Sequence, residues 1–294
     1  MPDRPRRTPA DGGGPGTGPD FIEALARGLD VIKAFGPARP VLALSEVAAA
    51  TGLARPTARR ILLTLEELGY VRTVSGGVSL TPRVLELGMA YVRSMSLWDV
   101  ARPHMEQLVE QTHESSSMAQ LDGSDIVYVA RVAVPKIIAL SVNIGTRFPA
   151  LQTSLGKVLL AELGRDALAG VLAEPSRSGI APRWRPTRAE RDAALREVRV
   201  QGWALTDEQL AAGIRSIAAP VRDGDGEVVA ALNVTVHAAE TPVAVLVQQH
   251  LPRLLAAAGQ ISADWAVHQS APHTVVRAAT AEPVSRVPRV RRAP

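Results

Sequence analysis

At 294 residues the chain is longer than one typical domain, and its 46% hydrophobic content is enough to bury an ordinary core, so two domains are expected. The net charge of +4, from 33 basic and 29 acidic side chains, is too small by itself to indicate a nucleic-acid partner. The absence of cysteine excludes disulfides, thiolate metal sites and cysteine nucleophiles, and it fits a cytoplasmic protein.

The two ends of the chain differ from its middle in composition and in the periodicity of apolar residues. Residues 1–19 are rich in glycine and proline, and residues 269–294 lack periodicity, so both are predicted to be disordered tails. The arginines of the C-terminal tail are expected to be solvated, with loose contact to nucleic acid as the alternative. No apolar stretch follows the N-terminal arginines, and no apolar run approaches the roughly 18 residues of a membrane span. Neither a signal peptide nor a membrane partner is predicted.

Residues 20–81 have the pattern of three helices followed by a hairpin. Apolar residues at helical spacing predict a first helix in "FIEALARGLDVIKAFG". Ser45 is a plausible N-cap for a short second helix, and a third is expected over 55–68. Two apolar runs around 75–77 predict the hairpin. Thr81 and Pro82 then start a fourth helix over 82–96, which would link the two domains.

The second and third predicted helices have the spacing of a helix-turn-helix. Gly52 permits the bend, and Ala48 and Ala58 are small where the helices must approach. Ala58, Ile61, Leu62 and Leu65 recur at helical spacing and are expected to face the core. The arginines at the start of the third helix then point elsewhere, at the end where a recognition helix meets bases and where the helix dipole favours phosphate. The alternative is a small helical domain with solvated arginines.

The predicted contacts to double-stranded DNA lie on these two helices and the hairpin. Arginine on a recognition helix can bond guanine bidentately, and an arginine on the wing can contact the DNA backbone or minor groove. The candidate DNA-binding residues are Ser45, Arg55, Pro56, Thr57, Arg59, Arg60 and Arg72.

Residues 97–268 alternate between short β runs and helices, as in an α+β or α/β sensor domain. Strands are expected in "MAQLD", "IVYVARV", "IIALSV", "IAAPV" and "VVAALNVTV". Helices are expected over 155–163, over 188–202 with a capping box from Thr187 and Glu190, and from Thr241-Pro242 to about Trp265.

The sequence contains no recognisable catalytic or metal-binding pattern. "SLGKVLL" lacks the glycine and the Ser/Thr of a phosphate-binding loop, and the six histidines lack metal-ligand spacing. No catalytic residue, metal or cofactor is predicted, so the protein is not expected to be an enzyme. The alternative to a DNA-binding regulator is a metabolite-binding module or enzyme whose N-terminal helices serve assembly only.

The chain resembles the IclR-type transcriptional regulators over about residues 21–266. The N-terminal match is "LARGLDVIKAF" and "LSEVAAATGLARPTARRILLTLEELGYV"; the C-terminal match is "FPALQTSLGKVLLA", "GWALTDEQLAAGIRSIAAPV" and "GEVVAALNVTV". The resemblance implies an α+β chain: a winged helix, a linker helix and a GAF-like domain that binds a small-molecule effector. It also implies a cytoplasmic homodimer or homotetramer without catalytic activity. "GTRFPALQTSLGKVLLA" is most similar to regulators of protocatechuate, 4-hydroxybenzoate and β-ketoadipate catabolism, so control of aromatic acid catabolism is expected.

The same resemblance implies an effector pocket in the C-terminal domain. Asn233 and Thr235 are two apart and polar within an apolar run, so they share one strand face and need partners, either a ligand or nearby backbone. Arg131 and Arg147 are candidate countercharges or simply members of salt bridges. At Thr206 some family members carry an acidic residue that touches the ligand, and here Asp207 is next to it. The implied effector-binding residues are Leu140, Ser154, Leu155, Asp207, Ile214, Ser216, Asn233 and Thr235.

Overall fold

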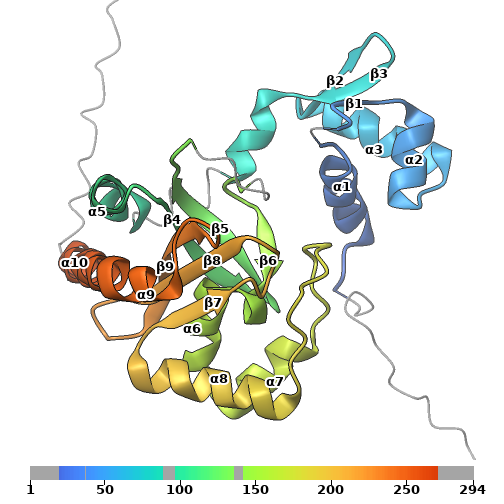
Figure 1. Ribbon diagram of the computed structural model, residues 1–294. Helices are drawn as coiled ribbons and strands as arrows, with labels where there is room; N and C mark the ends of the chain where they lie inside the picture. The colour runs from blue at the N-terminus through green and yellow to red at the C-terminus, as the bar shows by residue number, and fades with distance from the viewer. Residues whose placement is uncertain (1–19, 37, 89–96, 136–141, 271–294) are drawn as a thin grey trace, which may run out of the picture. The chain divides into compact units, whose positions relative to one another are not determined.

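The computed structural model describes residues 20–36, 38–88, 97–135 and 142–270 of the chain. The chain divides into two compact units, residues 1–95 and 96–294 (Figure 1).

The N-terminal unit is a three-helix domain with a small antiparallel sheet. Its strand order is β1-β3-β2, and the β2–β3 hairpin forms the wing. Buried apolar residues from all three helices, among them Val31, Val47 and Leu62, form one core with Leu42 and Val71 of the sheet. The elements are α1 (Glu23–Lys33), β1 (Val41–Leu42), α2 (Leu44–Thr51), α3 (Arg55–Glu67), β2 (Val71–Val74) and β3 (Gly77–Leu80).

The predicted helix-turn-helix is confirmed, with one correction at the start of α2. Gly52 ends α2 with φ +67°, a left-handed conformation that glycine adopts without strain. The prediction that Ser45 caps α2 is wrong, because the helix begins earlier and Ala43 is its N-cap. Alanine has no side-chain acceptor, so only Glu46 contributes a cap: its carboxylate accepts the Ala43 N–H at 2.7 Å.

The start of the predicted linker helix is present in the N-terminal unit. The Thr81 hydroxyl accepts the N–H of Arg83 at 3.2 Å, and a 3₁₀ turn, Pro82–Val84, follows. Residues 85–88 continue as α-helix. The remainder of the linker, 89–96, lies outside the described residues, so its predicted course stays an expectation.

The C-terminal unit is built on a six-stranded antiparallel sheet of order β6-β5-β4-β9-β8-β7, which confirms the α+β class. Its strands are β4 (Ser115–Asp122), β5 (Asp125–Val132), β6 (Arg147–Pro149), β7 (Ala204–Asp207), β8 (Ile214–Arg222) and β9 (Val228–His237). Its helices are α5 (Leu97–Thr112), α6 (Ser154–Glu162), α7 (Arg165–Ala173), α8 (Arg188–Gln201), α9 (Val243–Val245) and α10 (Leu251–Ser270).

Helices cover both faces of this sheet. α5 and α10 pack on one face, while α6 packs against β4, β8 and β9 on the other (Figure 1). On the α6 side, Ala119, Ala218 and Ala231 are fully buried, and their small side chains let the helix approach the strands closely. Gly156 lets α6 approach the 3₁₀ turn Ala150–Gln152, because a Cβ there would lie 2.1 Å from the Ala150 carbonyl oxygen.

Several local predictions in this unit are confirmed. Thr187 and Glu190 form the capping box of α8, which ends at Gly202 with φ +79°. A turn at 223–226 joins β8 to β9.

Other elements differ from the prediction. α5, α7, β6 and β7 were not predicted as separate elements. The last helix contains a π-helical turn, Leu246–His250, and continues past Trp265 to Ser270. The strand expected in "IIALSV" lies almost wholly outside the described residues. None of the described helices combines the length and the hydropathy that crossing a bilayer requires.

Candidate functional site

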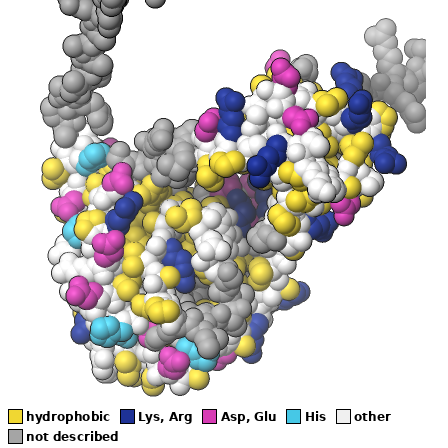
Figure 2. Space-filling model, turned by 90° about the horizontal axis from the view of Figure 1, so that it is seen from above, with side chains coloured by type: hydrophobic (Ala, Val, Ile, Leu, Met, Phe, Trp, Pro, Cys, Tyr) yellow, Lys and Arg dark blue, Asp and Glu magenta, His cyan; other side chains and the backbone are white. Residues whose placement is uncertain are grey.

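Two regions bring the predicted site residues together: the surface of α3 and a cavity in the C-terminal unit. On α3 the buried side chains are Ala58, Leu62 and Leu65, which confirms their predicted place in the core; Ile61 is half-buried against the same core. Arg55, Pro56 and Arg59 are exposed. Basic and hydrophobic side chains both reach the surface of the N-terminal unit (Figure 2).

The candidate DNA contacts do not all share one side of α3. Thr57 and Arg60 line a groove between α1 and α3, whereas Arg55 and Arg59 do not. Within the described part of the chain, Arg55, Arg59 and Arg60 have no ion pair. Ser45 is exposed on α2, and Arg72 on the wing donates to the Ser79 hydroxyl at 3.3 Å. The charges of the four arginines, Arg55, Arg59, Arg60 and Arg72, are therefore available to an external anion such as a phosphate.

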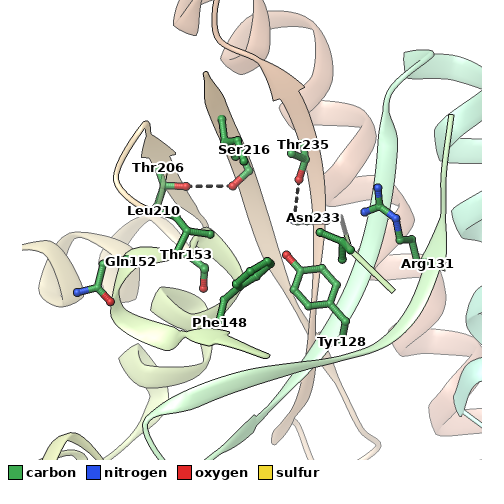
Figure 3. A pocket seen from close by; sticks show the side chains of 12 residues that line it. Tyr128, Arg131, Phe148, Gln152, Thr153, Thr206, Leu210, Ser216, Asn233 and Thr235 are labelled. Atoms are coloured by element: carbon green, nitrogen blue, oxygen red, sulfur yellow. Dashed lines mark hydrogen bonds between the residues drawn. The ribbon is translucent and has the colours of Figure 1, made fainter. Parts of the chain in front are cut away.

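A cavity that is partly open to solvent lies on the α6 side of the large sheet (Figure 3). Four of the predicted effector residues line it, namely Ile214, Ser216, Asn233 and Thr235. The other lining residues are Tyr128, Arg131, Val142, Phe148, Gln152, Thr153, Thr206 and Leu210.

Register and a β-bulge bring the polar lining residues together. Arg131 pairs with Ser117, and Ser117 pairs with Asn233, so these three lie in one row across β5, β4 and β9. The pairing then shifts from Met118↔Ala130 to Ala119↔Tyr128, which leaves Val129 without a partner. This extra residue turns Tyr128 to the same face as Arg131, although they are three apart in sequence.

The row that contains Arg131 has more hydrogen-bond donors than acceptors. Arg131 is half-buried, and its guanidinium donates to the Ser117 hydroxyl at 3.0 Å. Asn233 Oδ1 accepts the Ser117 N–H at 2.9 Å, and Nδ2 donates to the Thr235 hydroxyl at 3.0 Å. The expected backbone partner of Asn233 is thus present, but one amide hydrogen and the Thr235 hydroxyl hydrogen remain free. An anion would satisfy these donors.

A chain of three hydroxyls forms a second polar group. Ser216 Oγ lies 2.8 Å from Ser154 Oγ and 3.0 Å from Thr206 Oγ1, and all three side chains are buried. Two hydrogen bonds use two of the three hydroxyl hydrogens, so one hydrogen is left to donate elsewhere. Thr206 and Ser216 line the cavity, and the chain can therefore bind a polar substituent of a ligand.

The remaining wall is apolar and aromatic. The rings of Tyr128 and Phe148 meet edge to face with centroids 5.6 Å apart. Burial raises the pKa of Tyr128 to about 12, partly opposed by the charge of Arg131, so the phenol stays neutral at physiological pH. Burial also lowers the pKa of Arg131 from its usual value, yet an arginine remains charged at neutral pH.

Other predicted effector residues lie outside the cavity lining. Leu155 is fully buried in the core beneath α6, and Ser154 reaches the cavity only through its bond to Ser216. The Asp207 side chain binds Arg215 at 2.8 Å, because strand alternation turns Thr206, and not Asp207, toward the cavity. Arg147 pairs with Asp122 and Asp125, which makes it a structural salt bridge. Leu140 lies outside the described residues.

Sequence reasoning missed Tyr128, Phe148, Gln152, Thr153 and Leu210 as cavity residues. No periodic signal identifies them, since Tyr128 lies on the bulged strand β5, Phe148 on the three-residue strand β6, and the other three in a 3₁₀ turn, a helix cap and a loop. At the start of α6, Thr153 Oγ1 accepts the N–H of Gly156 at 3.0 Å, so this N–H group is not available to a ligand. Across the described residues, no group of three or more His, Asp or Glu side chains is placed to hold a metal ion.

Comparison with known proteins assigns both units to one family. Residues 24–75 match the IclR helix-turn-helix domain, and residues 89–263 match the bacterial transcriptional regulator IclR C-terminal domain. The Pca regulon regulatory protein of Pseudomonas putida is 40% identical over 240 residues, which are 81% of this chain and 82% of that protein.

Two solved structures are similar as well. A putative transcriptional regulator from Rhodococcus sp. RHA1 has 46% identity and a TM-score of 0.74, over 84% of this chain and all of that one. A double mutant of the PobR inducer-binding domain from Acinetobacter, in complex with 3-hydroxybenzoic acid, has 29% identity and a TM-score of 0.51, over 56% of this chain and 97% of that one. The match of both units, in the expected order, shows that this chain belongs to the IclR family of bacterial transcriptional regulators.

Proposed function

We propose that the cavity binds a small aromatic carboxylate, and that this ligand sets the affinity of the regulator for its operator DNA. The observation that carries the proposal is Arg131, a half-buried cation that has no carboxylate partner among the described residues. A buried charge without a counterion is costly. A ligand carboxylate would supply the counterion.

The neighbours of Arg131 favour an anion over a neutral ligand. Asn233 and Thr235 each have a hydrogen free to donate on the same side of the cavity. Tyr128, with its pKa raised to about 12, is a neutral hydroxyl in the same space (Figure 3). Hydrogen bonds from charged or polar donors to a carboxylate are stronger than those to a neutral acceptor.

The walls of the cavity favour an aromatic ring. Phe148, Leu210 and Ile214 offer apolar and aromatic contact, and the hydroxyls of Thr206 and Ser216 suit a ring hydroxyl. The family relative named for the Pca regulon and the domain bound to 3-hydroxybenzoic acid support the same ligand class. We therefore propose that the protein controls the catabolism of aromatic acids through the β-ketoadipate pathway.

Isothermal titration calorimetry with the full chain tests directly which class of ligand the cavity binds. The panel is 4-hydroxybenzoate, protocatechuate, 3-hydroxybenzoate and β-ketoadipate, with 4-hydroxybenzyl alcohol as a matched control that lacks only the carboxylate. We expect at least one hydroxybenzoate to bind in the micromolar range and the alcohol to bind about tenfold or more weakly, since a charge-assisted hydrogen bond contributes roughly 1.5–3 kcal/mol. Equal binding of the acid and the alcohol would exclude the role of Arg131.

The proposed contacts to DNA are the residues at the start of α3, with Ser45 on α2 and Arg72 on the wing. Arg55 and Arg59 are exposed and unpaired in the described chain, and they adjoin the helix N-terminus, which favours phosphate. Pro56, Thr57 and Arg60 complete the proposed set. Because its target is operator DNA, the protein is proposed to work in the cytoplasm.

The proposed homo-oligomer has a candidate surface in the N-terminal unit. The groove between α1 and α3 is lined by leucines, of which Leu25 is 61% and Leu29 43% exposed. We propose that a second copy covers the exposed leucines of α1 and leaves the α3 residues Thr57 and Arg60 to DNA. Sedimentation of the Leu25→Glu variant tests this, and we expect the oligomer to dissociate.

The proposed domain boundaries are unchanged from the sequence analysis. They are 20–81 for the winged helix, 82–96 for the linker helix and 97–268 for the effector-binding domain, with tails at 1–19 and 269–294.

A further inference from the structure

A second groove, distinct from the effector cavity, lies between α7 and α8 of the C-terminal unit. Its lining shares no residue with that of the cavity. Leu168 and Leu172, with Ala169 and Ala173, form the apolar part of its surface, and Leu195 borders it as a buried side chain. The charged side chains that line it are Arg165, Arg188, Arg191, Arg196, Arg199 and a single carboxylate, Asp192.

This groove carries a large excess of positive charge. Asp192 is already bound by Arg191, at 2.6 and 2.8 Å, and lies 3.8 Å from Arg188. Arg199 donates to the backbone carbonyls of Ala161 and Leu163 at the end of α6, at 2.7 and 3.3 Å, and it has no carboxylate partner among the described residues.

Arg165 and Arg196 have no hydrogen bond or ion pair within the described chain. The acidic residues Asp166, Glu190 and Glu197 belong to the same two helices, but none of them lines the groove. Two guanidinium groups are therefore free to bind external carboxylates.

Two of these arginines stand where a helix disfavours positive charge. Arg165 is the first residue of α7, and Arg188 is the first residue of α8. The helix macrodipole places partial positive charge at this end, so acidic residues are normally found there and a cation costs stability. The positive charges of Arg165 and Arg188 therefore add to the partial positive charges at the N-termini of α7 and α8. Each first turn also contains one acidic residue, Asp166 in α7 and Glu190 in α8, which offsets part of this repulsion, and an anionic partner would offset the rest.

We propose that the groove binds an acidic amphipathic helix of another protein. Its carboxylates would pair with the arginines, and its apolar residues, at helical spacing, would cover the leucines of the groove. α7 is about 13 Å long and α8 about 21 Å, which suits a partner helix of a few turns. The tails of this chain are not the occupant, because both carry more arginine than acid.

Nucleic acid fits this groove less well than an acidic helix. Its lining contains no aromatic side chain on which a base could stack. A leucine surface between the arginines offers nothing to phosphates. The groove therefore combines positive charge with an apolar surface, and an acidic amphipathic helix matches both.

The test uses the full chain and a fluorescein-labelled peptide of about 14 residues, roughly four helical turns, with a repeating Glu-Leu-Leu-Glu unit. Anisotropy is measured for the unmodified protein, for the Arg165→Gln/Arg196→Gln variant, and for a control, Arg185→Gln/Arg253→Gln. Both control positions are exposed, unpaired within the described residues and outside the groove, so the two variants lose the same net charge. A peptide with lysine in place of glutamate checks the sign of the charge.

We expect salt-sensitive binding of the acidic peptide that weakens about tenfold in the groove variant and changes less than about twofold in the control. The lysine peptide should not bind. Absence of binding, or equal loss in both variants, would overturn the proposal. Displacement of the peptide by non-operator duplex DNA would assign the groove to nucleic acid instead. Loss of self-association in the groove variant, measured by sedimentation, would assign it to a second copy.

Discussion

At the residue scale, one unpaired residue in β5 decides which side chains form the effector cavity. Because Val129 is bulged, Tyr128 and Arg131 share the face that carries Asn233 and Thr235. Regular alternation correctly predicted that Asn233 and Thr235 share a face. It gave no reason to prefer Arg131 over Arg147, and it could not be applied to Thr206 and Asp207, because strand β7 was not predicted. Those choices depend on a bulge and on strand ends, which periodicity does not determine.

Replacing Arg131 by methionine should remove ligand affinity while leaving the fold intact. Methionine keeps an unbranched side chain but neither donates nor carries charge. We expect the dissociation constant for a hydroxybenzoate to rise about 10- to 100-fold, measured by titration calorimetry, with operator affinity unchanged. The matched control, Arg185→Met, should bind the ligand normally. Unchanged affinity in Arg131→Met would mean that the ligand carboxylate lies elsewhere.

Lys157 makes a prediction about the dependence of stability on pH. It is buried in α6 with its amine 4.5 Å from the centre of the Trp184 ring, and burial lowers its pKa to about 8, opposed by Glu197. The unfolded value is about 10.4. Between these two values the unfolded chain binds more protons than the folded chain, so this lysine makes the free energy of unfolding rise with pH.

The Lys157→Met variant lacks this titration. We expect the stability of the unmodified protein relative to the variant to increase between about pH 8 and about pH 10.4, as measured by urea unfolding at both limits. Other groups titrate in both proteins and cancel in the difference. A stability difference that is the same at both pH values would show that Lys157 keeps an ordinary pKa.

At the scale of elements, caps and turns were predicted better than short strands and short helices. Thr187, Glu190 and Gly202 define α8 by local chemistry that can be read directly from sequence. α7 and β7 have weaker local signals, since their place depends on packing against distant parts of the chain. Ser45 illustrates the limit of a cap rule: a good N-cap residue lies inside α2 because Glu46 already satisfies the Ala43 N–H.

Gly156 should be among the least replaceable glycines of the C-terminal unit. A Cβ there would lie 2.1–2.4 Å from three backbone atoms of Ala150, so α6 would have to move off the turn that borders the cavity. We expect Gly156→Ala to destabilise the protein by about 1–3 kcal/mol or more in urea unfolding. Gly259 in α10 has nothing within 4 Å of the same position, and Gly259→Ala should stabilise by about 0.5–1 kcal/mol. The same response from both variants would contradict this packing.

At the scale of the whole molecule, the sequence indicated two units because its pattern of apolar residues changes from helical periodicity to short β runs. The structure has two compact units, and the family match covers both. In a regulator of this kind, a ligand changes DNA binding only if it binds the DNA-competent and DNA-incompetent arrangements with different affinity.

The DNA-binding unit yields a prediction that does not depend on the effector. Arg55→Ala and Arg59→Ala should each weaken operator binding and, where the side chain contacts phosphate, reduce the slope of log affinity against log salt by about one. Leu63 is exposed on the same helix, and Leu63→Ala is the control for a change that removes no charge. Filter binding at several salt concentrations measures these slopes. Equal slopes in all three variants would place the DNA elsewhere.

The most direct test of the account is operator affinity with and without the ligand. Fluorescence anisotropy of the full chain on its own upstream DNA, at two salt concentrations, is titrated in the presence of each hydroxybenzoate and of β-ketoadipate. The account predicts specific, salt-sensitive binding that one of these carboxylates shifts about 5- to 150-fold, and that the same compound no longer shifts in Arg131→Met. Operator affinity that stays the same when a tightly bound carboxylate saturates the cavity would contradict it.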